Sequence, residues 1–239
     1  MKKASFFILI FAILLSLFAH AASDEVIVSY EEGLRYYFKS KGVRPTEKEY
    51  LAIAKDWFGD TYREFYNDEF EWEGKFRKIK EEFNDLIDSY QDARYIIHAK
   101  DSVGQYSFEK GGFDIHFGEG SYFNYDNGAR IFGNMKDVDV NMINCGDYNF
   151  LPYEQEEAKK FIARRRSSSG SIDRSVMLRI HLNFIPVDSD DYNEFFLRFR
   201  SDDSVYRLLA NVTSIEVFED NTLRNFMGEL CDGGQTESL

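Results

Sequence analysis

Hydrophobic and polar residues alternate most regularly between Ser175 and Asp188. The apolar residues occupy every second position: Val176, Leu178, Ile180, Leu182 and Phe184. Polar residues lie between them: Arg179, His181 and Asn183. Because successive side chains of a strand point to opposite faces, this pattern predicts a long strand with one apolar face and one polar face. We expect a central strand of the main sheet, with the earlier helices packed on its apolar side.

Apolar residues nearer the N-terminus recur at steps of three and four, which is the spacing of one helical face. Three helices are expected within residues 29–91. The first begins after a capping box at Ser29 and ends near Gly42, the second follows a capping box that begins at Thr46, and the third is capped by Asp68. A single bent helix from Thr46 to Gln91 is the competing interpretation, and we favour two antiparallel helices.

The hydrophobic period changes to two from Arg94 onward, which indicates strands. Taking Gly111-Gly112 as a two-residue turn sets Phe108 opposite Ile115 and Tyr106 opposite Phe117. Further elements are expected in chain order: strands at 122–123 and 138–142, a helix from Pro152 to about Arg165, a flexible connector at 164–170, a turn at 188–191, strands at 195–200 and 212–218, and a helix near 223–230. The predicted fold class is α+β, with N-terminal antiparallel helices packed on one face of a mostly antiparallel β-sheet.

The N-terminus has the layout of a secretory signal. Lys2 and Lys3 supply the charged region, residues 6–18 are almost wholly apolar, and Ala19-His20-Ala21 supplies small residues at a cleavage site. An uncleaved anchor is the alternative, but the apolar run is shorter than the roughly 20 residues that a spanning helix needs. We therefore expect residues 1–21 to be removed and the protein to be periplasmic or secreted, without stable membrane insertion.

The remainder, residues 22–239, is expected to form one domain. Its helical part covers about 29–91, its sheet part about 94–219, and residues 220–239 form a C-terminal tail. Aromatic residues make up 17% of the chain, with 23 Phe and 15 Tyr, which is ample material for a packed core.

Acidic residues dominate the charge of the chain, which is −13 in full and −15 after loss of the two N-terminal lysines. Such a protein is repelled by nucleic acid and by anionic membrane surfaces, so we expect neither as a partner. Its overall field favours cations or basic partners.

Two cysteines, Cys145 and Cys231, remain in the processed chain. An even count in an oxidising compartment predicts one disulfide, and two buried thiols are the alternative. The chain has no C-x-x-C, so catalytic redox use is not indicated.

Sequence patterns for catalysis or metal binding are weak throughout. We expect no catalytic residue, no metal and no cofactor, because no nucleophile, nucleotide or zinc-protease motif occurs. Carboxylates and aromatic residues concentrate within Glu64–Glu73, which resembles the pairs used in sugar hydrolysis but also fits helix capping. The acids that begin at Asp137 lack the glycine and glutamate of a calcium loop. The histidines are expected on the polar faces of strands: His98, His116 and His181.

A basic strip is the most specific surface that the sequence indicates. Residues 159–207 contain ten basic and seven acidic residues, although the chain as a whole is strongly acidic. Arg179 and His181 lie on the polar face of one expected strand, and Arg198 and Arg200 on that of its expected partner. Arginine forks bind carboxylate or phosphate, so these four residues are the candidate ligand-binding site. The alternative is that they neutralise the acids of the protein itself.

Three segments carry a resemblance to a known family: Tyr66-Asn67-Asp68-Glu69-Phe70-Glu71-Trp72, Gly104-Gln105-Tyr106-Ser107-Phe108, and Arg174 to Arg179. Over most of residues 46–200 the chain resembles an uncharacterised family of bacterial secreted proteins that carry a domain of unknown function. The resemblance implies a bacterial exported protein with no established activity, and it supplies no catalytic residues.

The leading hypothesis is an exported, non-catalytic protein that binds a protein partner or an anionic small-molecule ligand. One alternative is a cell-envelope hydrolase that uses carboxylates of Glu64–Glu73. Another is a structural or assembly factor of the envelope.

Overall fold

A computed structural model describes residues 25–59, 66–91, 93–115, 121–125, 136–197 and 205–231. The helices are α2 Tyr30–Lys41, α3 Glu47–Phe58, α5 Glu69–Asp88, α6 Gln155–Arg164, α7 Asp190–Phe196 and the 3-10 turn η3 Cys145–Asp147. The strands are β1 Glu25–Ile27, β2 Arg94–Ser102, β3 Tyr106–Ser107, β4 Gly112–Asp114, β5 Tyr122–Tyr125, β6 Asp137–Ile143, β7 Phe150–Pro152, β8 Ser175–Ile185, β9 Val205–Phe218 and β10 Phe226–Glu229. The predicted α+β class is confirmed.

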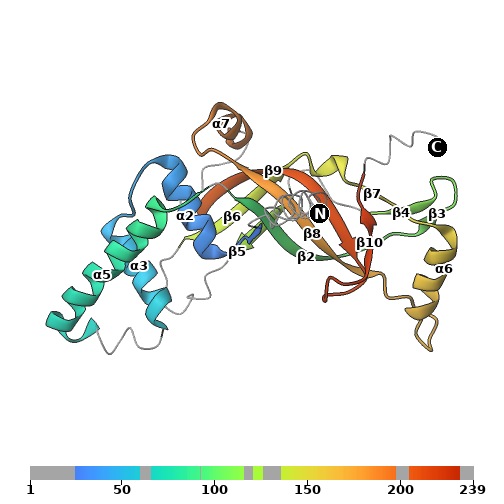
Figure 1. Ribbon diagram of the computed structural model, residues 1–239, viewed down its shortest axis with the longest axis horizontal. Helices are drawn as coiled ribbons and strands as arrows, with labels where there is room; N and C mark the ends of the chain where they lie inside the picture. Colours follow the sequence, from blue (N-terminus) through green and yellow to red (C-terminus); the bar gives the residue numbers. More distant parts are fainter. Residues whose placement is uncertain are drawn as a thin grey trace, which may run out of the picture.

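A seven-stranded mixed sheet forms the centre of the molecule, with strand order β1-β2-β8-β9-β6-β5 and β10 paired to β9. The β1–β2 and β6–β9 pairs are parallel, and the other pairs are antiparallel. Helices α2, α3 and α5 gather at one end of this sheet (Figure 1). At the other end lies α6 beside the small sheet β3-β4-β7. No helix among the residues described is long and apolar enough to cross a membrane.

Strand β8 is the central strand that the alternating pattern predicts. The residues at its even positions from Val176 to Leu182 are at most 1% exposed. Ile180 lies between Ile97 of β2 and Ile215 of β9, which are both buried as well. Burial of such side chains contributes roughly 1.5–3 kcal/mol each, so this three-strand contact is a main source of stability.

Helix α2 approaches the apolar face of the sheet closely because Gly33 has no side chain. A Cβ at this position would lie 2.6 Å from Cγ1 of Val138 and 3.4 Å from Cδ1 of Leu208. The ring of Tyr36 on the same helix stacks on Phe184 of β8, with centroids 4.5 Å apart. The helix therefore connects β6, β8 and β9 on one side of the sheet.

The sequence correctly locates the ends of the N-terminal helices. Ser29 and Thr46 cap α2 and α3, and Gly42 ends α2 in the left-handed conformation. Helices α3 and α5 are separate, as predicted, and Asp68 caps α5. The opposite ends of α3 contact the same part of α5: Glu47 pairs with Lys80, and Trp57 packs on Phe83, so the two helices cross.

The predicted register of the Gly111-Gly112 hairpin is wrong. Tyr106 pairs with Phe113, and Phe108 lies in the turn, where it is 77% exposed. Gly111 takes the left-handed conformation in a four-residue loop, while Gly112 belongs to the strand. A Cβ on Gly112 would lie 2.2 Å from the Leu151 carbonyl oxygen, so this glycine allows β7 to pack closely.

Two other predicted elements differ in kind from the observed ones. Residues 190–196 form α7 instead of part of a strand, because Ser189 caps the helix and Tyr192, Phe195 and Phe196 follow at helical steps. Residues 226–229 form β10 instead of a helix, since they pair with the end of β9. Consequently β9 occupies the place beside β8 that the 195–200 strand was expected to fill.

The predicted disulfide between Cys145 and Cys231 is not found. Cys145 is buried at the start of η3, Cys231 is exposed, and the two are not near each other. The backbone of Cys231 instead pairs with Phe150, which holds it beside β7. Burial, followed by the charge of Asp147, raises the pKa of the Cys145 thiol to about 12.

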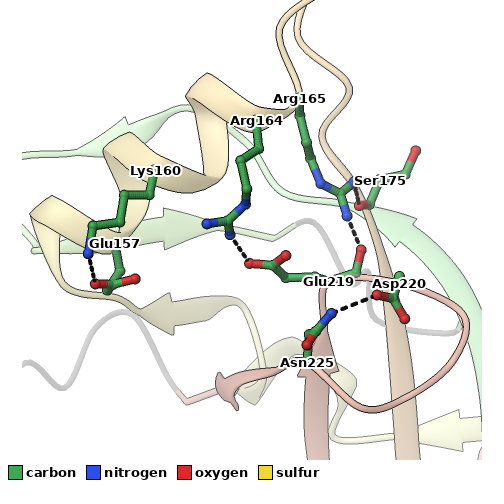
Figure 2. Close-up of polar contacts among 8 residues, drawn as sticks. All are labelled: Glu157, Lys160, Arg164, Arg165, Ser175, Glu219, Asp220 and Asn225. Carbon is green, nitrogen blue, oxygen red and sulfur yellow. Dashed lines mark hydrogen bonds and ion pairs between the residues drawn. The ribbon is translucent and has the colours of Figure 1, made fainter.

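The C-terminal end of α6 is attached to the main sheet by arginines (Figure 2). Arg164 pairs with the Glu219 carboxylate, while Arg165 donates to the carbonyl oxygens of Glu219 and Ser175. In the adjoining turn, the Asn225 amide donates to Asp220 at 2.9 Å. The first residues of the expected flexible connector are thus bound to the start of β8 and the end of β9.

We predict that Ile180→Ala lowers the free energy of unfolding by about 3 kcal/mol, because it leaves a cavity between three buried strands. Asn183→Ala on the exposed side of the same strand should change it by less than about 0.5 kcal/mol. Chemical denaturation measures both. Equal effects would contradict the central position of this face.

Candidate functional site

Arg179 and His181 lie together on the polar face of β8, as the sequence predicts. Both of them contact the carboxylate of Glu216. The Arg179 guanidinium donates to Oε2 of Glu216 on β9 at 3.1 Å, and Nε2 of His181 lies 3.4 Å from the same oxygen. Nδ1 of His181 is 3.9 Å from Oε1 of Glu25 on β1. Arg179 also lies over the Phe218 ring, 5.2 Å from its centroid. The charge of Arg179 is therefore largely neutralised within the protein.

His98 faces Arg179 across the β2–β8 pair. Burial lowers the pKa of His98, and the positive charge of Arg179 lowers it further. Nε2 of His98 and Nε of Arg179 are buried atoms that have no hydrogen-bond partner among the residues that the structure describes. Both atoms are also shielded from solvent.

The remaining members of the predicted basic strip, Arg198 and Arg200, lie outside the described residues, as does His116. The strip as predicted also required residues 195–200 to pair with β8. That place belongs to β9, which contributes Glu216 instead of two arginines.

The carboxylates proposed for hydrolysis are not gathered at a cleft where the structure describes them. Glu69, Glu71 and Glu73 are all exposed on α5, and none of them lines the two described cavities. Asp68 accepts hydrogen bonds from the first amides of α5, and Glu71 pairs with Lys75. The capping interpretation of this segment is confirmed for these residues. Glu64 lies outside the described residues.

Within the described ranges, no group of three or more His, Cys, Asp or Glu residues could hold a metal ion. Asp137 and Asp139 lie on the polar side of β6, where the Asn124 amide donates to both carboxylates. The interpretation of these acids as the polar face of a strand is confirmed.

A cavity of about 250 Å³ opens between the N-terminal helices and one end of the main sheet. Three residues of α2 line it, five come from the start of α3, and two come from the sheet side: Tyr30, Leu34, Phe38, Thr46, Lys48, Glu49, Ala52, Ile53, Lys136 and Tyr206. The wall is mainly aliphatic and aromatic, and a few charged groups lie among these residues. That composition is typical of small-molecule sites.

Glu49 is the best-bound charged group of this cavity. Its Oε1 accepts the Tyr206 hydroxyl hydrogen bond at 2.6 Å. Its Oε2 accepts from the Thr46 amide at 2.6 Å and from the Thr46 hydroxyl at 2.8 Å. Burial alone would raise the pKa of Glu49, but these bonds and the charge of Lys136 lower it below its ordinary value. Burial, followed by the hydrogen bond to Glu49, raises the pKa of Tyr206, so neither group is prepared to exchange a proton near neutral pH.

Lys136 and Lys48 supply positive charge at the same cavity. Nζ of Lys136 lies 5.3 Å from the Tyr206 ring centroid, and the Tyr30 hydroxyl donates to the Lys136 carbonyl oxygen at 3.0 Å. Lys48 is exposed on the first turn of α3. The hydrogen bond from Tyr30 holds the backbone of Lys136, and both lysines belong to the lining of the cavity.

A second cavity, of about 270 Å³, lies on another side of Phe38. Its charged groups already bind one another: Arg44 pairs with the Asp88 carboxylate at 2.6 Å, and Lys39 donates to the Asp88 carbonyl oxygen. It therefore offers fewer available groups to a ligand than the cavity at Glu49.

Sequence reasoning missed the cavity at Glu49. Thr46 and Glu49 were recognised as a capping box, but this motif alone says nothing about a neighbouring hollow. Lys136 follows a Gly- and Asn-rich stretch, and Tyr206 lies before the strand expected at 212–218. Their proximity depends on the parallel β6–β9 pair, which no local pattern indicates.

Residues 46–164 match the model of a protein family described as "Domain of unknown function (DUF4852)". The expected resemblance to a family with a domain of unknown function is thereby confirmed. The matched range includes the α3 residues of the cavity and Lys136, but not α2 or Tyr206. No curated protein and no solved structure matches the chain.

We predict that Tyr206→Phe lowers stability by about 1 kcal/mol at neutral pH, because it removes a hydrogen bond to a half-buried carboxylate. The folded state lowers the pKa of Glu49 below its ordinary 4.5, so this contribution is present above that pH and is lost as the pH falls through the lowered pKa. Denaturation curves from pH 7 to pH 3 should show the two proteins converging. Tyr122→Phe, at a 61% exposed position, is the control and should have no effect at any pH.

A double-mutant cycle of Arg179→Met and Glu216→Gln should give a coupling energy of about 0.5–1 kcal/mol, because both groups are partly buried. The coupling should weaken in high salt. Zero coupling would mean that Arg179 is not neutralised by Glu216 and is available to a partner.

Proposed function

We propose that this protein is an exported, non-catalytic binding protein, and that its ligand occupies the cavity between α2, α3 and the β6–β9 end of the sheet. The observation that carries the proposal is the composition of this cavity. An apolar wall and a few charged groups enclose about 250 Å³ beside a rigid sheet.

The state of the polar groups favours binding over catalysis. A general acid or base needs a pKa near the working pH. In this cavity the pKa of Glu49 is lowered and that of Tyr206 is raised. Both carboxylate oxygens of Glu49 already accept hydrogen bonds from Thr46 and Tyr206. These bonds hold the side chain of Glu49 in one position in the cavity wall.

Export is the second part of the proposal, and it is supported by the sequence of residues 1–21. Lys2 and Lys3, the apolar run at 6–18 and the small residues at 19–21 form the expected order of a secretory signal. Cleavage after Ala21 makes Glu25, the first residue of β1, the fourth residue of the processed chain.

The polar face of β8 is a second candidate, as a surface for a protein partner. Its support is the group of partly exposed polar and charged side chains on this face: Arg179, His181 and Glu216. Arg198 and Arg200 lie outside the described residues, and the place beside β8 that the predicted strip gave them belongs to β9.

Native mass spectrometry of the protein recovered from the export compartment tests the main proposal. We expect the chain to lack residues 1–21 and to bind a neutral apolar dye such as N-phenyl-1-naphthylamine after the purified protein has been stripped of ligands. Ala52→Leu should weaken dye binding about tenfold, because it fills the wall of the cavity.

Ala93→Leu provides the matched control, since Ala93 is partly buried but does not line the cavity. Equal dye binding by the wild type and Ala52→Leu would exclude the cavity as the site. A mass that includes residues 1–21 would contradict cleavage of the signal.

A further inference from the structure

The cavity at Glu49 carries positive charge on an acidic protein. Lys48 and Lys136 contribute two positive charges to its lining and Glu49 contributes one negative charge, which leaves +1. The chain as a whole has a net charge of −13. The negative charge of the whole chain repels anions. A local excess of positive charge therefore gives this opening a preference for anions that the rest of the chain does not share.

Glu49 is not available to attract a cation. Oε1 is bound by the Tyr206 hydroxyl, and Oε2 is bound by both the amide and the hydroxyl of Thr46. A cationic ligand would have to compete with these three hydrogen bonds and approach two ammonium groups at the same time.

The two lysines are less fully bound than Glu49, although the charge of Lys136 acts on Glu49 and its Nζ lies 5.3 Å from the Tyr206 ring centroid. Neither Lys48 nor Lys136 forms an ion pair with a carboxylate in the described part of the chain. Helix α3 begins beside them, and the positive end of its dipole adds to their effect. A carboxylate or phosphate group at the opening would therefore be attracted by two lysines that form no ion pair with a described carboxylate.

Behind the lysines, the wall can accept only apolar groups. Leu34, Phe38, Ala52 and Ile53 are all buried and line the cavity from α2 and α3. A free inorganic anion would leave this surface uncovered, whereas a ligand with an apolar chain would cover it.

We propose that the ligand is an amphiphilic anion, with a carboxylate or phosphate headgroup held by Lys48 and Lys136 and an apolar tail against Leu34, Phe38 and Ile53. This inference rests on the proposed function, because it assigns a chemical class to the ligand of the same cavity.

Isothermal titration calorimetry with probes of one tail length tests it: octanoate, octyl phosphate, octanol and octylammonium. Acetate and inorganic phosphate supply the headgroups alone. We expect octanoate and octyl phosphate to bind about tenfold more tightly than octanol, and the small anions and octylammonium to bind weakest. The preference for anions should fall as salt is added.

The double variant Lys48→Gln and Lys136→Gln should lose the tenfold preference for octanoate while it binds octanol as the wild type does, which also shows that its cavity is intact. Lys78→Gln, on the exposed side of α5 and outside the cavity, is the charge-matched control. Equal binding of octanol and octanoate, or an unchanged preference in the double variant, would overturn the anion assignment and leave a cavity that binds neutral ligands. Failure of every tailed probe to bind would overturn the proposed function itself.

Discussion

The contact between the even face of β8 and its two neighbours is the constraint on which the rest of the structure depends. Ile180, Ile97 and Ile215 meet at the centre of the sheet, and each is at most 2% exposed. Burial of one face obliges the other face to present Arg179, His181 and Glu216. A shift of register by one residue would exchange the two sets, so the same alternation fixes both the core and the polar surface.

Helix α2 packs on this sheet and also lines the proposed binding site. Its contact with β6 and β9 at Gly33 sets the distance from sheet to helix, and Phe38 then lies between the two cavities. Tyr206 completes the connection, since its ring packs against Phe38 while its hydroxyl binds Glu49 of α3. The cavity wall is thus made of residues that also hold the layers together, which favours a site of fixed shape.

The sequence indicates elements well where one physical cause dominates. Alternation places β8 and β6, and the hydroxyl and carboxylate caps place the starts of α2, α3 and α5, because these signals are local. Prediction from the sequence fails where contacts with residues far along the chain determine the local structure. Gly112 was expected in a turn but belongs to a strand that packs against Leu151, and residues 226–229 pair with β9 instead of forming a helix. The α7 error is different, since Ser189 and the aromatic residues after it were a readable helix signal.

The candidate sites also contain residues that a local pattern predicts and residues that only distant contacts bring together. Arg179 and His181 were predictable as neighbours on one strand, but their acid, Glu216, was not, because it comes from a strand 37 residues further along. The cavity residues come from four segments that meet through the β6–β9 pair. No periodic pattern within one segment indicates that these four segments lie close together.

The strand order also has a consequence for how a chain made from its N-terminus, or moved across a membrane in that direction, can fold. Strand β2 ends at Ser102, but its antiparallel neighbour β8 begins only at Ser175, and β9 ends at Phe218. The N-terminal helices can form early, yet the edge of β2 that pairs with β8 has no partner until residues 175–185 have been made. During that interval its unpaired N–H and C=O groups are open to pairing with another chain.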